Sequence, residues 1–516
     1  MEFQIYVFLL VLLQLYYIWS KISQSRSSLL KNPLAVVGGD GYLTSWKTCL
    51  KYLFRWPELM REGYLKYDAY QMPTLRGFVT FINNPADLKE FFQSPESVLS
   101  LLRPLSEELQ TDHTLPGALN RTTQAFLISL IRRVLDKSRI PYDALSEEIQ
   151  LFLESKVEPT LSDEWSNVQA FSFSMGIASQ IDNRVFVGTP LCEPRHAAPC
   201  RNKEYLEGVG MWAQRMAIGG QVVKLFPGFL RPFAARYLTS AVTQRQKFEK
   251  IMEPIVRDRM KVLTDKNSRN EPGENNSPFL DAMIQGLMGR AHGDLDSSLL
   301  ARLMLIVNTS ALHTTTVVLT TALYELASRP DLGEMLREEY LQKVGDCNGN
   351  ENAAAITTDL PMLDSFLKEV VRMTPPGHAT SFREVLKDFT FSSGLHVPAG
   401  VTLAVPTHAT YRDPRLYHDP DTFNPLRFYN QHAENKHGGT SFIDTSISDY
   451  VFSHGVHTCP GRWFASAGMK LVLINLLERY EIRFEKGKSK PRGISFQASF
   501  TPNMTAKIQL RRRRDS

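Results

Sequence analysis

A single cysteine near the C-terminal end of the chain lies in a glycine-punctuated segment. Residues 452–461 read FSHGVHTCPG, so Cys459 is flanked by Gly455 and Gly461. A stretch with helical periodicity follows and places Cys459 just before a helix. Backbone N–H groups and the dipole at that helix start would stabilise a thiolate, the form that serves as a soft axial metal ligand. The two glycines would let the backbone lie flat against a large bound group.

Two side chains beside the cysteine would complete a site of this kind. Phe452 would cover the side of the thiolate. His457 is placed to hydrogen-bond an anionic group. The segment therefore predicts a site that binds a metal together with a negatively charged ligand.

Three other interpretations of this segment stay open from the residues alone. Cys459 could be a buried structural thiol, the usual state of a lone cysteine. His454, His457 and Cys459 could belong to a zinc site, although a structural site needs four ligands and no C-x-x-C occurs in the chain. Cys459 could also be a protease nucleophile, although no family-specific signature surrounds it.

Two further patterns place polar groups on predicted helices. Glu369 and Arg372 are three residues apart and share one helix face, where an isolated ion pair contributes little. Residues 308–316 read NTSALHTTT in the middle of a long predicted helix. Serine and threonine hydroxyls there can bond to the carbonyl four residues earlier and bend the helix. A polar stripe between packed helices would look the same.

The cysteine segment resembles the haem loop of the cytochrome P-450 haem-thiolate monooxygenases. That loop reads Phe-x-x-Gly-x-x-x-Cys-x-Gly, and all four fixed positions are present here. The resemblance implies that Cys459 is the proximal ligand of the iron of haem b and that His457 contacts a haem propionate. It also implies that Phe452, Gly455 and Gly461 belong to the cofactor-binding loop.

Two more motifs of the same family occur in the expected order. Its Glu-x-x-Arg helix pairs with the arginine of a later Pro-x-Arg-Phe segment, and residues 425–428 read PLRF. The resemblance implies a triad of Glu369, Arg372 and Arg427 that acts as a structural lock behind the haem pocket. Arg383 lies where the family often has another propionate partner.

The polar stretch of the long helix resembles the family's oxygen-binding groove, with two departures. The family has Ala/Gly-Gly-x-Asp/Glu-Thr-Thr, and residues 310–315 read SALHTT. Ala311 replaces the usual glycine and His313 replaces the acid, while Thr314 keeps the proton-delivery position. The resemblance thus implies that Thr314 and His313 are the catalytic side chains, in a variant typical of some fungal members.

Helices must position these residues. Asp296 is a predicted N-cap for a helix that continues to Ala327, about 45 Å at 1.5 Å per residue. Further helices are predicted at 364–373 and 463–480, and the alternating residues 395–405 predict a hairpin. Strands are expected to be few and late. The predicted fold class is mainly α with small β-sheets, the cytochrome P-450 fold, preceded by one transmembrane helix.

The N-terminal segment predicts the membrane location. Residues 3–19 are apolar except for two glutamines, and Lys21, Arg26 and Lys31 follow them. A cleaved signal peptide is the alternative, but the basic start and small-residue cleavage site are missing. We therefore expect an anchor and linker at 1–28, a haem-thiolate monooxygenase domain at 29–516, and a single-pass protein of the endoplasmic reticulum membrane with its catalytic domain in the cytosol.

Composition limits the remaining function classes. The 59 Lys and Arg exceed the 54 Asp and Glu by five, and Arg511 to Arg514 alone could supply four of those charges. A nearly neutral body argues against a nucleic-acid partner. Five cysteines in 516 residues are too few for a disulfide framework and suit a reducing compartment.

The sequence as a whole predicts a monooxygenase that hydroxylates an apolar small molecule, most specifically a sesqui- or diterpenoid of a fungal secondary-metabolite pathway. A G-x-G-x-x-G fingerprint between a strand and a helix is missing, so electrons should come from a separate NADPH-cytochrome P-450 reductase on the same membrane. The resemblance implies that residues 217–233 form the substrate entrance. The alternatives are oxidation of a fatty acid or aromatic polyketide, a haem-thiolate isomerase or dehydratase that needs no reductase, and a haem sensor.

Three features depart from the family pattern. The proline-rich hinge after the anchor is reduced to Pro33. The Trp-x-x-x-Arg propionate motif is missing from residues 121–133. Residues 193–200 have the character of an insertion, which a surface loop tolerates at small thermodynamic cost.

Overall fold

The computed structural model describes residues 34–74, 77–161, 164–188, 203–224, 226–264, 278–289, 296–346, 359–433 and 441–514. These residues form a mainly helical fold with small β-sheets, which confirms the predicted fold class. The predicted anchor at 1–28 and the predicted insertion at 193–200 lie outside the described residues.

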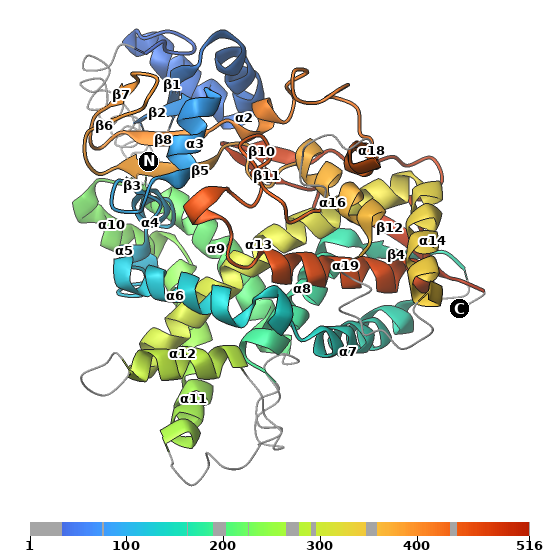
Figure 1. The fold of residues 1–516 in the computed structure, drawn as a ribbon. Coiled ribbons are helices and arrows are strands. Elements are labelled where there is room, and N and C mark those ends of the chain that lie inside the picture. The colour runs from blue at the N-terminus through green and yellow to red at the C-terminus, as the bar shows by residue number, and fades with distance from the viewer. Residues whose placement is uncertain are drawn as a thin grey trace, which may run out of the picture.

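Helices make up most of the described chain (Figure 1). Their bounds are α2 (Tyr42–Lys66), α3 (Pro85–Gln93), α4 (Leu102–Leu109), α5 (Thr111–Thr114), α6 (Arg121–Val134), α7 (Tyr142–Phe152), α8 (Ala170–Phe186), α9 (Lys203–Lys224), α10 (Arg231–Phe233), α11 (Ala241–Thr264), α12 (Pro278–Met288), α13 (Ser297–Ser328), α14 (Pro330–Asp346), α16 (Pro361–Met373), α17 (Thr407–Thr410), α18 (Arg427–Ala433) and α19 (Arg462–Arg479).

The long helix α13 crosses the middle of the fold in Figure 1 and packs against α8, α9 and α11. Asp296 caps it as predicted, because its side chain accepts the Ser298 N–H at 2.8 Å. Its 32 residues span about 48 Å at 1.5 Å per residue. The helices predicted at 364–373 and 463–480 are also present, as α16 and α19.

The strands form four sheets. Their bounds are β1 (Ala69–Thr74), β2 (Gly77–Ile82), β3 (Leu99–Ser100), β4 (Ser166–Gln169), β5 (Thr380–Val385), β6 (Phe389–Thr390), β7 (His396–Val397), β8 (Thr402–Val405), β9 (Tyr480–Arg483), β10 (Ile494–Phe496), β11 (Ser499–Thr501) and β12 (Lys507–Arg512). The largest sheet has the order β1-β2-β8-β5-β3, and only its β2–β8 pair is parallel. It lies at one end of the molecule with α2 and α3 (Figure 1).

Two predictions about strands were wrong. Residues 395–405 form no hairpin, because β7 pairs with β6 while β8 pairs with β2 and β5. The Gly400 N–H donates to the Val385 carbonyl at 2.7 Å, so the chain passes to a new neighbour at this turn. Strands are also not confined to the late part of the chain, since β1 and β2 lie at 69–82. Every residue of β2 is buried, and such a strand shows no alternation for a pattern to detect.

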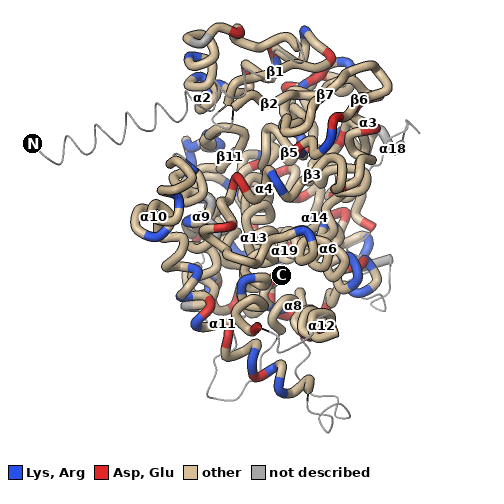
Figure 2. The backbone as a smooth tube through the Cα atoms, turned by 90° about the vertical axis from the view of Figure 1, so that its left-hand side faces the viewer, with Lys and Arg blue, Asp and Glu red and all other residues tan. Residues whose placement is uncertain are grey.

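Within the described residues, one helix is long and apolar enough to cross a membrane, and it is α13. However, 67 % of its most apolar window is buried inside the protein, as expected of a core helix. Lys and Arg are interspersed with Asp and Glu along the described backbone (Figure 2). The part of the backbone that Figure 2 colours therefore shows no long stripe of a single charge sign.

Candidate functional site

The segment that carries Cys459 is a tight loop before α19. The Cys459 N–H donates to the Phe452 carbonyl at 2.7 Å, and this bond closes the loop. Burial raises the pKa of the Cys459 thiol, and hydrogen bonds from the backbone N–H groups of Gly461 and Arg462 act in the opposite direction. The helix start thus offers the sulfur the N–H donors that the sequence predicted.

The two glycines of the loop have different surroundings. Gly455 has φ +67°, and a Cβ there would lie 2.2 Å from the Phe92 carbonyl oxygen, so close approach to the end of α3 requires glycine. A Cβ at Gly461 would meet only Ile131 Cγ2, at 3.9 Å, and Gly461 lines a cavity. Close packing against Phe92 therefore explains why position 455 is glycine, whereas Gly461 adjoins the open space of the cavity.

That cavity has a volume of about 540 Å³ and lies between the cysteine loop and the centre of α13. Its walls are largely apolar, as is usual for small-molecule sites. It brings together seven of the predicted site residues: Cys459, His457, Arg383, Phe452, Gly461, His313 and Thr314. Gly455, Glu369, Arg372 and Arg427 do not line it.

Two nitrogen atoms in the cavity wall lack hydrogen-bond partners within the described structure: Arg383 Nε and His457 Nε2. Arg383 is 2 % exposed, and burial lowers its pKa to about 10. Burial and the nearby Arg383 charge lower the pKa of His457 to about 4. His457 Nε2 lies 3.8 Å from Glu96 Oε2, beyond hydrogen-bond distance. An unpaired buried polar atom is costly, and the guanidinium N–H of Arg383, together with His457 in the tautomer that carries its proton on Nε2, suits this wall to an anion.

The centre of α13 supplies hydroxyls and one imidazole to the cavity. Ser310 Oγ donates to the Ile306 carbonyl at 2.8 Å, and Thr314 Oγ1 lies 3.4 Å from the Ser310 carbonyl. His313 has accessible surface on the cavity, but protein surrounds its ring, and this burial lowers its pKa. The weak bond of Thr314 leaves its hydroxyl easier to redirect than that of Ser310.

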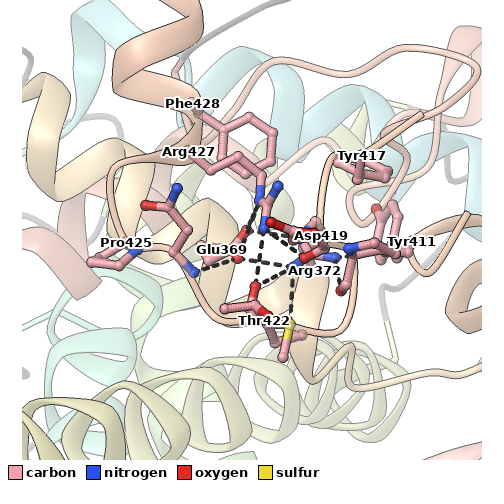
Figure 3. A network of polar contacts seen from close by, with 12 residues as sticks. Glu369, Arg372, Tyr411, Tyr417, Asp419, Thr422, Pro425, Arg427 and Phe428 are labelled. Atoms are coloured by element: carbon pink, nitrogen blue, oxygen red, sulfur yellow. Dashed lines mark hydrogen bonds and ion pairs between the residues drawn. The ribbon is translucent and has the colours of Figure 1, made fainter. Parts of the chain in front are cut away.

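The structure places the predicted triad in direct contact (Figure 3). Arg372 donates to both carboxylate oxygens of Glu369 at 2.7 and 2.8 Å, and Arg427 Nε lies 3.2 and 3.1 Å from the same oxygens. Exposure is 0 % for Glu369, 2 % for Arg372 and 7 % for Arg427. The Asn424 N–H also donates to Glu369 Oε1 at 2.8 Å. The two guanidinium groups donate further to backbone carbonyls, those of Tyr411, His418, Asp419, Pro420 and Thr422.

The sequence did not indicate two groups of residues near the site. Arg132 in the last turn of α6 donates to the Val456 carbonyl at 3.0 Å, beside His457. The family motif Trp-x-x-x-Arg does not indicate it, because residue 128, four positions before Arg132, is isoleucine. Ser381 and Ser453 both line the cavity and hydrogen-bond each other. Serine is too common a residue type to indicate a site. In addition, no local motif connects two residues that are 72 positions apart.

Comparison with known proteins identifies the family to which the chain belongs. The sequence model described as Cytochrome P450 matches residues 200–510. Cytochrome P450 monooxygenase 103 of Postia placenta is 30 % identical over 497 residues, which cover 94 % of this chain and 95 % of that protein. The chain belongs to the cytochrome P450 family. This finding confirms the predicted resemblance and makes the chain a cytochrome P450 monooxygenase.

Two further matches describe its neighbours in the family. The ent-kaurene oxidase of Gibberella intermedia is 28 % identical over 506 residues, covering 95 % of this cytochrome P450 and 89 % of the oxidase. The solved structure of retinoic acid bound cyanobacterial CYP120A1 matches with a TM-score of 0.65 and 20 % identity, over 90 % of this chain and 96 % of that chain. The latter supports the fold alone.

Members of this family contain haem iron with a thiolate ligand, and the residues of this cytochrome P450 fit that group. A haem of the thiolate-ligated kind needs a cysteine sulfur for the iron and hydrogen-bond donors for its two carboxylates. The cavity offers the buried Cys459 sulfur at a helix start, and the unpartnered Arg383 Nε and His457 Nε2 in its wall.

Proposed function

We propose that this cytochrome P450 hydroxylates a sesqui- or diterpenoid in a fungal secondary-metabolite pathway, with O₂ and with electrons from a separate NADPH-cytochrome P450 reductase. The observation that carries the proposal is the apolar cavity that extends from Cys459 to the small residues Ser310 and Ala311 of α13. Small side chains at that point leave room for a bulky skeleton. The ent-kaurene oxidase relative, whose name refers to a diterpene hydrocarbon, supports the substrate class.

Three residues would bind the cofactor. Cys459 would ligate the haem iron, and Arg383 Nε and His457 Nε2 would each donate to a haem carboxylate. The bound haem would supply the oxidising chemistry, with the thiolate favouring O–O bond cleavage. The protein would exclude water with its apolar cavity wall, including Phe452, and orient the substrate.

Thr314 and His313 would manage protons in this site. The Thr314 hydroxyl is only weakly bonded to the Ser310 carbonyl, so it can turn and donate to a group in the cavity. His313 stands where the family usually has a carboxylic acid, and it also lines the cavity. A neutral imidazole can pass a proton because one ring nitrogen donates while the other accepts.

The triad of Glu369, Arg372 and Arg427 would act as a structural lock. Its residues lie outside the cavity lining, but they connect α16 to the segment before α18, because Arg372 donates to the backbone carbonyls of Tyr411, Pro420 and Thr422 and Glu369 accepts from the Asn424 N–H. That connection would keep the chain from 411 to 427 fixed against α16, on which the wall residue Val371 is found.

Exposed apolar side chains support a membrane location. Leu43 and Phe54 of α2 are 86 % and 67 % exposed, and Phe229 and Phe233 near α10 are 81 % and 56 % exposed. Gln497 links the two regions, because its N–H donates to the Leu53 carbonyl of α2 and its side chain donates to Gln221 of α9. An apolar surface of this kind suits contact with a lipid interface and entry of an apolar substrate between residues 217 and 233.

We further propose that residues 1–28 are an anchor and linker and that residues 29–516 are a haem domain. The anchor would hold the protein in the endoplasmic reticulum membrane, with the haem domain in the cytosol. Basic groups stand next to the cysteine loop on the outer side: Arg132 binds the Val456 carbonyl, Arg462 binds the Cys459 carbonyl at 3.1 Å, and Lys137 lies over the Trp463 ring. An acidic surface of a reductase would complement this face.

Optical titration of the purified, haem-loaded ferric protein tests the substrate class. A terpenoid that enters the cavity should displace water beside the iron and shift the Soret band toward the high-spin form. No shift with terpenoids, together with a shift by fatty acids or aromatic polyketides, would replace the substrate class and leave the haem assignment intact. Substrate-dependent NADPH consumption with a purified reductase separates a monooxygenase from an isomerase, a dehydratase or a haem sensor.

A further inference from the structure

Two serines in the cavity wall have a backbone conformation that favours glycine. Ser381 has φ +55° and Ser453 has φ +58°, and both line the cavity. A non-glycine residue in this region is strained and persists only where the surrounding structure fixes it. The structure around the cavity must therefore fix both serines.

A hydrogen bond joins the two serines. Their hydroxyl oxygens lie 3.2 Å apart, and either one can donate to the other. Ser381 lies in β5 and Ser453 lies in the cysteine loop, so this single bond connects two segments that are 72 residues apart. Both side chains are partly buried, which limits competition from bulk water.

A β-bulge coincides with the position of Ser381. In the β5–β8 pair, Thr380 is opposite Val405 and Arg383 is opposite Leu403, so β5 contains one extra residue between these pairs. A bulge of this kind redirects a side chain and is common beside active sites. Without it, the regular alternation of β5 would continue from Thr380 to Arg383 and Ser381 would not have its left-handed conformation.

The left-handed conformation alone does not distinguish these serines. Gln110, Asp419 and Gln497 also have positive φ within the described chain. None of those three lines the cavity, whereas Ser381 and Ser453 line it and bind each other. Ser381 and Ser453 therefore differ from the other three in that they line the cavity and pair with each other.

We propose that the Ser381–Ser453 hydroxyl pair is a positioning clasp that fixes the distance between the two walls of the cofactor site. One wall is β5, in which Arg383 follows Ser381 by two residues. The other is the cysteine loop, in which Cys459 follows Ser453 by six. The clasp keeps the arginine donor and the sulfur at the separation that one rigid, flat cofactor requires, and the two left-handed residues are retained for this bond.

A double-mutant cycle with glycine tests the clasp. Ser381→Gly and Ser453→Gly remove each hydroxyl but tolerate the left-handed backbone, and the cycle cancels what glycine does to each segment alone. The two measurements on the full-length, haem-loaded protein are the rate of haem transfer to apomyoglobin and the position of the ferrous–CO Soret band. Each single variant should lose haem about fivefold faster, equivalent to about 1 kcal/mol for one hydroxyl bond.

The double variant should lose haem no faster than either single variant, because the same bond is broken once. All three should convert part of the red-shifted ferrous–CO band to a blue-shifted one, since the sulfur is no longer fixed against β5. Ser448→Ala is the matched control, because it breaks the Ser446–Ser448 hydroxyl pair of 3.1 Å, and neither serine lines the cavity. It should change neither quantity.

Three results would overturn the clasp. The first is additive rates in the double variant, about 25-fold in total by the same arithmetic. The second is an unchanged Soret band in every variant. The third is loss of folding, seen by circular dichroism, in either single variant, because a positioning bond should not decide whether the chain folds. The clasp rests on the proposed haem site. If Cys459 were not the haem ligand, the unmodified protein itself would lack the red-shifted band, so a failure of the proposed function can be distinguished from a failure of the clasp.

Discussion

Glu369 is buried and pairs with two arginines, so a change of this side chain should lower the free energy of unfolding. Glu369→Gln keeps the shape of the side chain but removes the charge that two buried guanidinium groups share. Breaking a buried ion pair by changing one partner costs about 3–5 kcal/mol, because an uncompensated charge remains. In addition, the new amide directs N–H donors at the donors of Arg372 or Arg427.

The structure places the expected loss near the lower end of that range. Both guanidinium groups keep hydrogen bonds to backbone carbonyls after the substitution, and these partly solvate the charges. We therefore expect Glu369→Gln to lower the free energy of unfolding by about 3 kcal/mol. That is more than a hundredfold in the unfolding equilibrium.

Urea unfolding of the haem-loaded protein, followed by circular dichroism, measures this loss. The matched control is Glu58→Gln, because Arg55 and Glu58 also pair three residues apart but are both 63 % exposed. The control should leave the urea midpoint unchanged, since exposed pairs contribute little. Equal midpoints for Glu369→Gln and Glu58→Gln would refute the structural lock.

Three further predictions concern the cysteine, the protons and pH. Cys459→Ser should abolish the ferrous–CO band that gives the family its name; a retained band would mean that another residue is the ligand. Thr314→Ala should bind haem normally but release reducing equivalents as hydrogen peroxide, while His313→Asp should be tolerated; a peroxide assay showing unchanged coupling in Thr314→Ala would contradict the role of that hydroxyl. Burial lowers the pKa of His378 to about 2, whereas an unfolded histidine takes up a proton below about 6.5. The unfolded state thus binds more protons in acid, and this group alone should lower the free energy of unfolding by up to about 1.4 kcal/mol per pH unit below about pH 6.5, in addition to His408 and His457, whose pKa values burial also lowers. His378→Phe, which keeps an aromatic ring against Trp56, should flatten this slope in urea titrations, and an unchanged slope would exclude His378 as its source.

The helices that carry the candidate site were predicted from local signals. The Asp296 cap and the apolar periodicity define α13, and the same kind of periodicity defines α16 and α19. Cys459 could be located because glycines and a helix start surround it in sequence. The Glu369 triad required a motif that joins two segments, and the resemblance to the family supplied it.

The parts that the sequence did not predict depend on distant partners. Residues 395–405 alternate, but alternation reports the face of a strand and not its neighbour, so β7 and β8 were paired with each other instead of with β6 and with β2 and β5. Likewise, Ser381 and Ser453 are ordinary in type, and their hydroxyls meet through a contact between β5, which has a bulge at this point, and the cysteine loop.

One physical feature connects the separate observations on the cavity. The folded chain holds two nitrogen atoms, Arg383 Nε and His457 Nε2, without hydrogen-bond partners in the cavity lining, and it holds two serines in a strained conformation in the same lining. A protein that only needed to fold would gain stability by relaxing each of these features. A ligand that fills the cavity and hydrogen-bonds both groups would recover that cost. Departures of this kind from the arrangement that is best for folding alone are expected at functional sites.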